Sequence, residues 1–332
     1  MIKQSAFKPS GIFRSTHLQT VYPSFVGRVK NLPRIRERFE LIDGDFVDLD
    51  WAGQQYATQN SSRIVLILHG LCGSSDSNYV VGLQRKLLDQ QVASVAMNFR
   101  GCSGEPNRLL RAYHSGETSD MNEVFHALYA QYPNASFAAV GYSLGANAML
   151  KWLGEMGAKS PLSAAVAVSS PYDLSLSTNR MNRGISILYQ RHLVNGLNDY
   201  VKNKLAYYQR EKNWDKYKQL RALGSLVDTK TFVEFDGRIT APLFGYDSAE
   251  HYYEQCSSLP FLRDIKTPTL LIHAMDDPFV HAEAIPTADH LAADTVLELS
   301  ELGGHVGFVG GSIFKPDFWL DQRIPEYLLE RL

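Results

Sequence analysis

The stretch AAVGYSLGANAMLKWLGE, residues 138–155, decides how the rest of this chain is interpreted. It begins as a short apolar run that is typical of a buried strand, and it continues as an alanine- and leucine-rich run that favours a helix. Between the two lies Gly141-Tyr142-Ser143-Leu144-Gly145, a G-x-S-x-G motif at a predicted strand-to-helix turn. Such a turn projects the serine hydroxyl, and the flanking glycines let strand and helix approach closely. The motif alone also fits a serine that merely caps a helix.

Apolar strand patterns and helix patterns alternate on both sides of this stretch. The strands are apolar throughout rather than half polar, which indicates a parallel sheet covered by helices on both faces. Alternating residues around Asp43-Gly44-Asp45 predict a β-hairpin before that sheet begins. We predict strands at 63–68, 93–99, 164–168, 269–274 and 295–299, helices at about 79–91 and 117–132, a further helix between 280 and 295, and an amphipathic C-terminal segment at 318–332.

Two segments depart from this alternation. Residues 1–35 contain Pro9, Pro23 and Pro33 and predict an irregular N-terminal arm. Residues 174–266 lack a clean buried-strand pattern, are helical in pattern and are rich in Tyr, Lys and Arg, which predicts an inserted helical cap. The α/β core is then formed by residues 36–173 and 267–332.

Composition restricts the class of protein. The 332 residues are 45% hydrophobic and 20% charged, with a net charge of -2, so a large core is expected and no basic face for nucleic acid. No apolar run is long enough to span a membrane, and the N-terminus lacks the apolar core of a signal peptide. Three unpatterned cysteines and the absence of CxxC and HExxH motifs favour a reducing compartment and no zinc site. We expect a cytoplasmic protein that needs no metal or cofactor.

Side chains that can carry chemistry gather where the predicted strands end, which is where open α/β sheets place their sites. They are His69-Gly70-Leu71, Ser143, Asp173, Asp276, Asp277 and His305. The chain order of serine, acid and histidine is that of α/β-hydrolases. Of the ten histidines, His305 alone follows two glycines after the last strand. We interpret His69 as a brace of its loop and His273 as a core residue, while His114 is a candidate for the wall of a pocket.

The sequence resembles the α/β-hydrolase superfamily and, within it, the bacterial YheT-like esterase group, which is related to eukaryotic abhydrolase-domain lipases and yeast medium-chain fatty acid ethyl ester synthases. The resemblance covers nearly the whole chain. The stretches that carry it are HLQTVYPSF, LHGLCGSSDSNY, MNFRGCSGEPNR, YHSGETSD, VGYSLGANAMLKWL, SSPYDL, HAMDDPFV and GGHVGF. It implies the α/β-hydrolase fold, with Ser143 as nucleophile and His305 as base.

The acid and the oxyanion donors also follow from this resemblance. The superfamily pattern places the acid directly before x-hydrophobic-Val, which favours Asp277 over Asp276, with Asp173 as a third candidate. The backbone N–H groups of Leu71 and Leu144 are the expected oxyanion donors. Their side chains give no further support, because a backbone donor needs no particular residue type.

These observations favour a serine carboxylic-ester hydrolase that cleaves short- or medium-chain acyl esters through an acyl-enzyme. The aromatic and apolar cap indicates an acyl chain rather than a sugar or a peptide. Two alternatives stay open: an alcohol O-acyltransferase that uses the same acyl-enzyme, and a non-catalytic binding protein on the same scaffold. The expected partner is a small-molecule ester.

Overall fold

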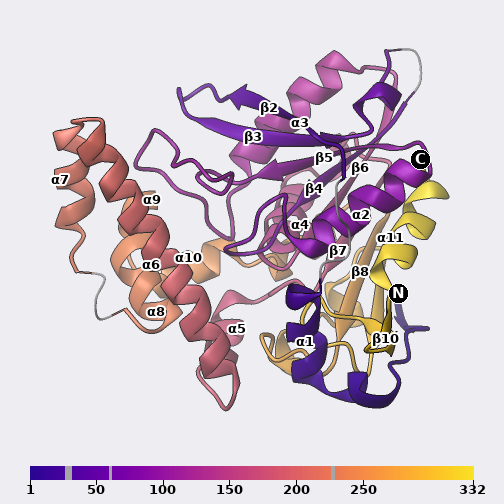
Figure 1. The fold of residues 1–332 in the computed structure, drawn as a ribbon. Helices are drawn as coiled ribbons and strands as arrows, with labels where there is room; N and C mark the ends of the chain where they lie inside the picture. Colours follow the sequence, from indigo (N-terminus) through magenta and orange to yellow (C-terminus); the bar gives the residue numbers. More distant parts are fainter. Residues whose placement is uncertain (27–31, 60–61, 226–228) are drawn as a thin grey trace.

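A nine-stranded sheet organises the chain in the computed structural model, with strand order β1-β9-β8-β7-β6-β4-β5-β3-β2 (Figure 1). The structure describes residues 1–26, 32–59, 62–225 and 229–332, so 27–31 of the predicted arm and 226–228 of the predicted cap lie outside the described residues. The strands are β1 Ile2–Gln4, β2 Ile35–Glu40, β3 Phe46–Ala52, β4 Ser62–Leu68, β5 Ala93–Asn98, β6 Ala135–Tyr142, β7 Ala164–Val168, β8 Thr269–Ala274 and β9 Thr295–Ser300.

The sheet is parallel except at one edge. Strands β5, β4, β6, β7, β8 and β9 pair in parallel, and only β3 and β2 run antiparallel to their neighbours. The predicted hairpin around Asp43-Gly44-Asp45 is the β2–β3 pair. The predicted α/β fold, with its mostly parallel sheet and N-terminal hairpin, is thus confirmed.

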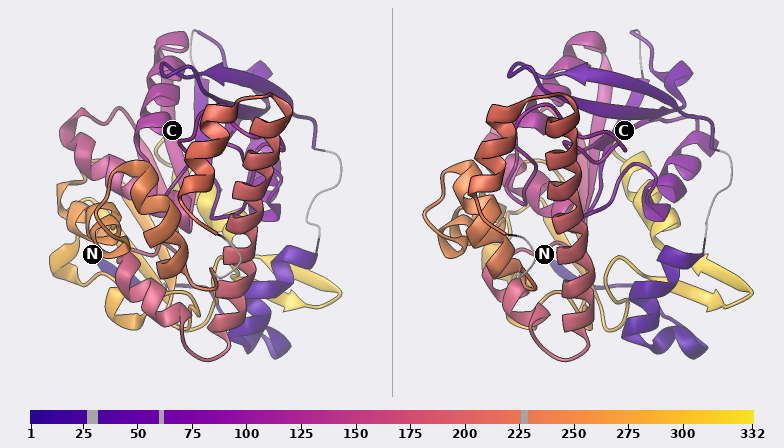
Figure 2. Two further views of the ribbon diagram at one scale, coloured as in Figure 1. Left: turned by 90° about the vertical axis from the view of Figure 1, so that its left-hand side faces the viewer. Right: turned by 60° about the vertical axis from the view of Figure 1, so that its left-hand side comes forward.

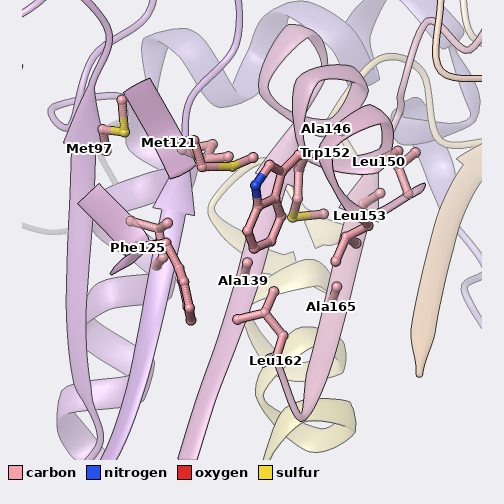
Figure 3. Close-up of a cluster of buried hydrophobic side chains, with 14 of the residues drawn as sticks. Met97, Met121, Phe125, Ala139, Ala146, Leu150, Trp152, Leu153, Leu162 and Ala165 are labelled. Atoms are coloured by element: carbon pink, nitrogen blue, oxygen red, sulfur yellow. The ribbon is translucent and has the colours of Figure 1, made fainter. Parts of the chain in front are cut away.

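Alternate side chains of the strands enter two different cores. On β4, Leu66 belongs to the face covered by α3 Ser119–Gln131 and α4 Leu144–Met156, while Ile67 belongs to the face covered by α2 Asn78–Asp89 and α11 Leu320–Leu329. Figure 3 shows Trp152 and Leu153 of α4 packed with Phe125 of α3 over the strands. Both faces of the central strands β4, β6, β7 and β8 are buried, which is why these strands show no alternation of polar and apolar residues.

The prediction of an irregular N-terminal arm is wrong for two segments. Strand β1 adds to the sheet edge in parallel with β9, and α1 spans Thr16–Phe25, with Ser15 as its N-cap and Pro23 inside its last turn. The helix is held by its tertiary contacts. The buried amide of Gln19 donates to the carbonyls of Phe13 and Val309 and accepts the N–H of Val309. These bonds outweigh the helix-breaking tendency of the proline.

The prediction of a helix between residues 280 and 295 is also wrong. Only two 3-10 turns form there, Ala282–Ala284 and Ala288–His290. Pro286 lies between them, and the preceding Ile285 is extended, as residues before proline tend to be. A second, short hairpin of β10 Val309–Ser312 and β11 Lys315–Phe318 follows the last sheet strand.

Between β7 and β8 the chain is helical, and Figures 1 and 2 show these helices gathered on one side of the sheet. They are α5 Leu174–Met181, α6 Ser186–Arg210, α7 Trp214–Ala222, α8 Phe232–Phe235, the π-helical turn η4 Asp236–Thr240, α9 Ala241–Phe244 and α10 Ala249–Cys256. The helical pattern seen in the sequence therefore forms helices. The domain boundaries at 174 and 266 stay a prediction.

A buried ionic network joins these helices to the sheet. Arg100, at the end of β5, bonds both carboxylate oxygens of Asp120 and pairs with Asp45 of the hairpin turn. Asn107 donates to Asp45 and in turn accepts from the Lys204 ammonium of α6. The four charged side chains are buried, so removing Arg100 would leave two buried carboxylates, Asp45 and Asp120, without their shared guanidinium partner.

Candidate active site

Ser143 lies at the turn between β6 and α4 in a strained backbone conformation. Its φ of 52° and ψ of -118° are unusual for a residue other than glycine. A Cβ added to Gly145 would lie 2.5 Å from the His69 carbonyl oxygen, and one added to Gly141 would lie 2.6 Å from the Ala146 Cα. Both glycines of the motif are therefore required by close packing between strand and helix.

The structure brings the serine, one histidine and one aspartate into hydrogen-bond contact. His305 Nε2 lies 2.9 Å from Ser143 Oγ, and His305 Nδ1 lies 2.8 Å from Asp277 Oδ2. The other oxygen of Asp277 accepts the N–H of Phe279 at 2.8 Å. The Phe279 ring stacks on the imidazole, with the ring centroids 4.1 Å apart. These contacts fix the orientation of the imidazole between hydroxyl and carboxylate.

The two other candidate acids lie elsewhere. Asp276 accepts the N–H of Gly304 at 2.9 Å and the hydroxyl of Thr16 at 2.7 Å. Asp173 is the N-cap of α5, where it accepts the N–H of Leu176. Neither carboxylate contacts the imidazole in the described part of the chain. The geometry therefore distinguishes the adjacent aspartates, which the sequence could rank only through the superfamily pattern.

Helix α1 supports the loop that carries His305, a role that the residue-based reasoning missed. Thr20 accepts the N–H of His305 at 3.1 Å, and its hydroxyl donates to the Thr16 carbonyl. At Gly304, where φ is +59°, an added Cβ would lie 2.7 Å from both the Thr16 carbonyl oxygen and Thr20 Oγ1. The available signal was the stretch HLQT, whose last residue, Thr20, contacts His305.

The loop after β4 supplies one free backbone donor. The N–H groups of Gly70 and Cys72 bond the hydroxyls of Tyr79 and Tyr113, and that of Gly73 bonds the Gly70 carbonyl. Within the described residues, the N–H of Leu71 has no acceptor. Leu144 is the first residue of α4, so its N–H has no intrahelical acceptor either. Both residues line the same pocket as Ser143 and His305.

This pocket has a volume of about 740 Å³ and extends from α1 to the helices between β7 and β8. Most of its wall is apolar or aromatic, with contributions from Val21 and Phe25 of α1 and from Leu197 and Phe235 of the helical segment. A pocket of this size and lining suits a small, mainly apolar molecule.

The remaining histidines singled out from the sequence are buried. His69 accepts the N–H of Phe99, which fits its expected role as a loop brace, and burial lowers its pKa to about 4. Burial likewise lowers the pKa of His273 and of His114 to about 4. His273 is a core residue packed near Tyr172, as expected. His114 lines the pocket, which confirms the prediction that it belongs to a pocket wall.

The described residues contain neither a metal-binding cluster nor a membrane-spanning helix. No group of three or more His, Cys, Asp or Glu side chains is arranged to hold a metal ion there. None of the described helices has the length and apolarity needed to cross a membrane.

Comparison with known proteins places these observations in a family. The model of the alpha/beta hydrolase fold matches residues 63–312. The chain is 42% identical over 322 residues to YheT of Escherichia coli (strain K12), which carries the name of an esterase, and the alignment covers 97% of this chain and 92% of that one. It is 28% identical to human phospholipase ABHD3 over 90% of this chain and 73% of that one. The solved Pyrococcus furiosus esterase Pf2001 superposes with a TM-score of 0.56 at 17% identity, over 93% and 96% of the two chains.

Proposed function

The chain belongs to the family of hydrolases with the alpha/beta hydrolase fold, and on this premise we propose that it is a serine esterase that cleaves short- or medium-chain acyl esters through an acyl-enzyme. The observation that carries the proposal is the continuous hydrogen-bonded series from Ser143 through His305 to Asp277. A serine hydroxyl is a weak nucleophile near neutral pH, and it needs an adjacent base that a third group orients.

In the first half of the reaction, Ser143 Oγ attacks the ester carbonyl carbon while His305 Nε2 takes the hydroxyl proton. Asp277 holds the proton on Nδ1 and stabilises the imidazolium that forms. The carbonyl oxygen becomes an oxyanion, for which the N–H groups of Leu71 and Leu144 are the proposed donors. The tetrahedral intermediate then expels the alcohol, which takes its proton from His305, and leaves Ser143 acylated.

In the second half, water takes the place of the alcohol. His305 removes a proton from the water, whose oxygen attacks the acyl carbon, and the Ser143 oxygen leaves with the proton that His305 returns. The product is a carboxylic acid, and the free enzyme is restored. The apolar wall of the pocket supports an acyl chain as one arm of the substrate.

Turnover of p-nitrophenyl butyrate and p-nitrophenyl octanoate by wild type and by Ser143→Ala tests the proposal. We expect release of p-nitrophenol by wild type and a loss of at least about 10³-fold in kcat for the variant, with an unchanged circular dichroism spectrum. Labelling of Ser143 by a fluorophosphonate probe provides a second readout. Equal turnover by both proteins, or a wild type that the probe does not label, would overturn the proposal.

A further inference from the structure

One carboxylate in the pocket wall takes no part in the proposed chemistry. Asp236 opens the π-helical turn η4 and lines the same pocket as Ser143 and His305, and only 9% of its surface is exposed. Its two oxygens accept hydrogen bonds from the hydroxyls of Thr240 at 2.7 Å and Tyr253 at 2.8 Å. A pocket that holds only an acyl chain has no use for a buried carboxylate, because burying this group costs free energy.

Asp236 lacks a cationic partner. Among the described residues, it contacts no Lys, Arg or His, and both of its hydrogen-bond donors are neutral hydroxyls. Burial accordingly raises its pKa to about 6. An ionised carboxylate can accept about four hydrogen bonds, and two are made here. In contrast, the buried carboxylates of Asp45 and Asp120 are paired with Arg100.

The surroundings of Asp236 are aromatic. The rings of Phe232, Phe235, Tyr252 and Tyr253 also line the pocket. The faces of aromatic rings attract cations, and the attraction is stronger when the cation has lost its water. A buried carboxylate without a counter-ion, in a pocket wall that also contains several aromatic rings, has the chemistry of a site for an organic cation.

We propose that Asp236 and these rings form a subsite for an ammonium group in one arm of the ester substrate. The proposal rests on the proposed esterase function and adds a substrate class to it. The bound cation supplies the charge that Asp236 lacks, and the rings contact its alkyl groups. A neutral group of the same shape fills the same space but leaves the carboxylate unpaired.

The test compares isosteric substrates. Butyrate esters of choline and of longer ω-trimethylammonio alcohols are each paired with the ester in which a tert-butyl group replaces the trimethylammonium group. We expect wild type to prefer the cationic ester at the best linker length by about tenfold or more in kcat/KM. In Asp236→Asn that ratio should fall to about one, because the amide is isosteric but uncharged. A ratio within each protein cancels any general change in activity.

Glu234→Gln is the matched control. Glu234 lies two residues away on α8, is exposed and completes a capping box with Thr231, and glutamine can also complete one. It removes a nearby charge outside the pocket wall, so the wild-type ratio should persist. A wild type without preference for the cation, or an Asp236→Asn variant that keeps the preference, would overturn the subsite. Turnover of the neutral esters that depends on Ser143 would leave the esterase proposal standing in that case.

Discussion

The adjacent aspartates Asp276 and Asp277 offer the sharpest test of the proposed catalytic roles, because the same substitution should cause a large loss of activity at one position and a small loss at the other. Asp277 accepts two hydrogen bonds whose donors are fixed: the backbone N–H of Phe279 and the Nδ1–H of His305. Asparagine has one acceptor oxygen and one NH2 group. In Asp277→Asn one of these two N–H donors must therefore face the NH2 group of the asparagine, which is also a donor.

The imidazole can relieve this conflict only by moving its proton to Nε2. That nitrogen then faces Ser143 with a proton and cannot accept the one from the hydroxyl. The variant also loses the carboxylate that stabilises the imidazolium in the transition state. We expect a loss of about 4 kcal/mol of transition-state stabilisation, which is about 10³-fold in kcat.

Asp276→Asn should be mild. The amide oxygen can still accept from the N–H of Gly304, and the Thr16 hydroxyl can turn so that it accepts from the NH2 group instead of donating. We expect a loss of less than about tenfold in kcat, with a small change in the thermal midpoint.

Both variants are assayed with p-nitrophenyl butyrate, and the release of p-nitrophenol gives kcat and KM. Thermal unfolding followed by circular dichroism shows whether each variant is folded at the assay temperature. The reasoning fails if Asp276→Asn loses more activity than Asp277→Asn, or if a folded Asp277→Asn keeps more than about a tenth of the wild-type kcat.

Three further predictions follow from the contacts described. Gly145→Ala should lower the free energy of unfolding by ~3 kcal/mol in a urea titration, because the added Cβ would clash with two backbone carbonyls. Gly237→Ala is the control: its Cβ would make only a van der Waals contact, so the free energy of unfolding should not fall. Thr20→Val should lower kcat about tenfold at unchanged KM, because the Thr20 hydroxyl holds the His305 backbone. Thr20→Ser keeps the hydroxyl and should retain the wild-type kcat. Equal kcat in the two variants would contradict this reasoning. Burial lowers the pKa of His273 to about 4 in the folded protein. In the unfolded chain the same imidazole binds a proton below about pH 6.5. The free energy of unfolding should therefore fall progressively as the pH drops from about 6.5 to about 4. His273→Leu should remove up to ~3 kcal/mol of that acid dependence, measured as the free energy of unfolding at pH 7 and pH 4.5.

The sequence predicts the sheet well because burial imposes a simple pattern. Strands such as Ile64–Leu68 are covered on both faces, so they contain no polar interruptions, and their alternation with helices leaves few arrangements. Predictions failed where tertiary contacts decide the local structure. Helix α1 contains a proline and forms because Gln19 is fixed by distant partners, whereas the segment around Pro286 has a helix-like pattern but forms only 3-10 turns.

For the candidate site, the sequence identifies residue types at strand ends but not their orientation. Ser143 and His305 can be identified as candidates from the sequence because each lies in a distinctive glycine-containing motif. It cannot separate Asp276 from Asp277 by physical reasoning, since both follow the same strand and only the turn geometry aims one of them at the imidazole. The sequence does not identify Asp236 for a different reason. A single acidic residue in a helical segment is usually solvent-exposed, and the burial of Asp236 is known only from the structure.

The contact between Thr20 and His305 joins residues 285 positions apart. Bringing together two points so distant along the chain costs loop entropy, and contacts of this kind are typically late events in folding. The proposed base is therefore seated only once the two ends of the polypeptide have met. Ester turnover during refolding would thus report the closure of the whole chain, whereas helices such as α3 and α4, which pack on the central strands, could form their helical signal before the ends meet.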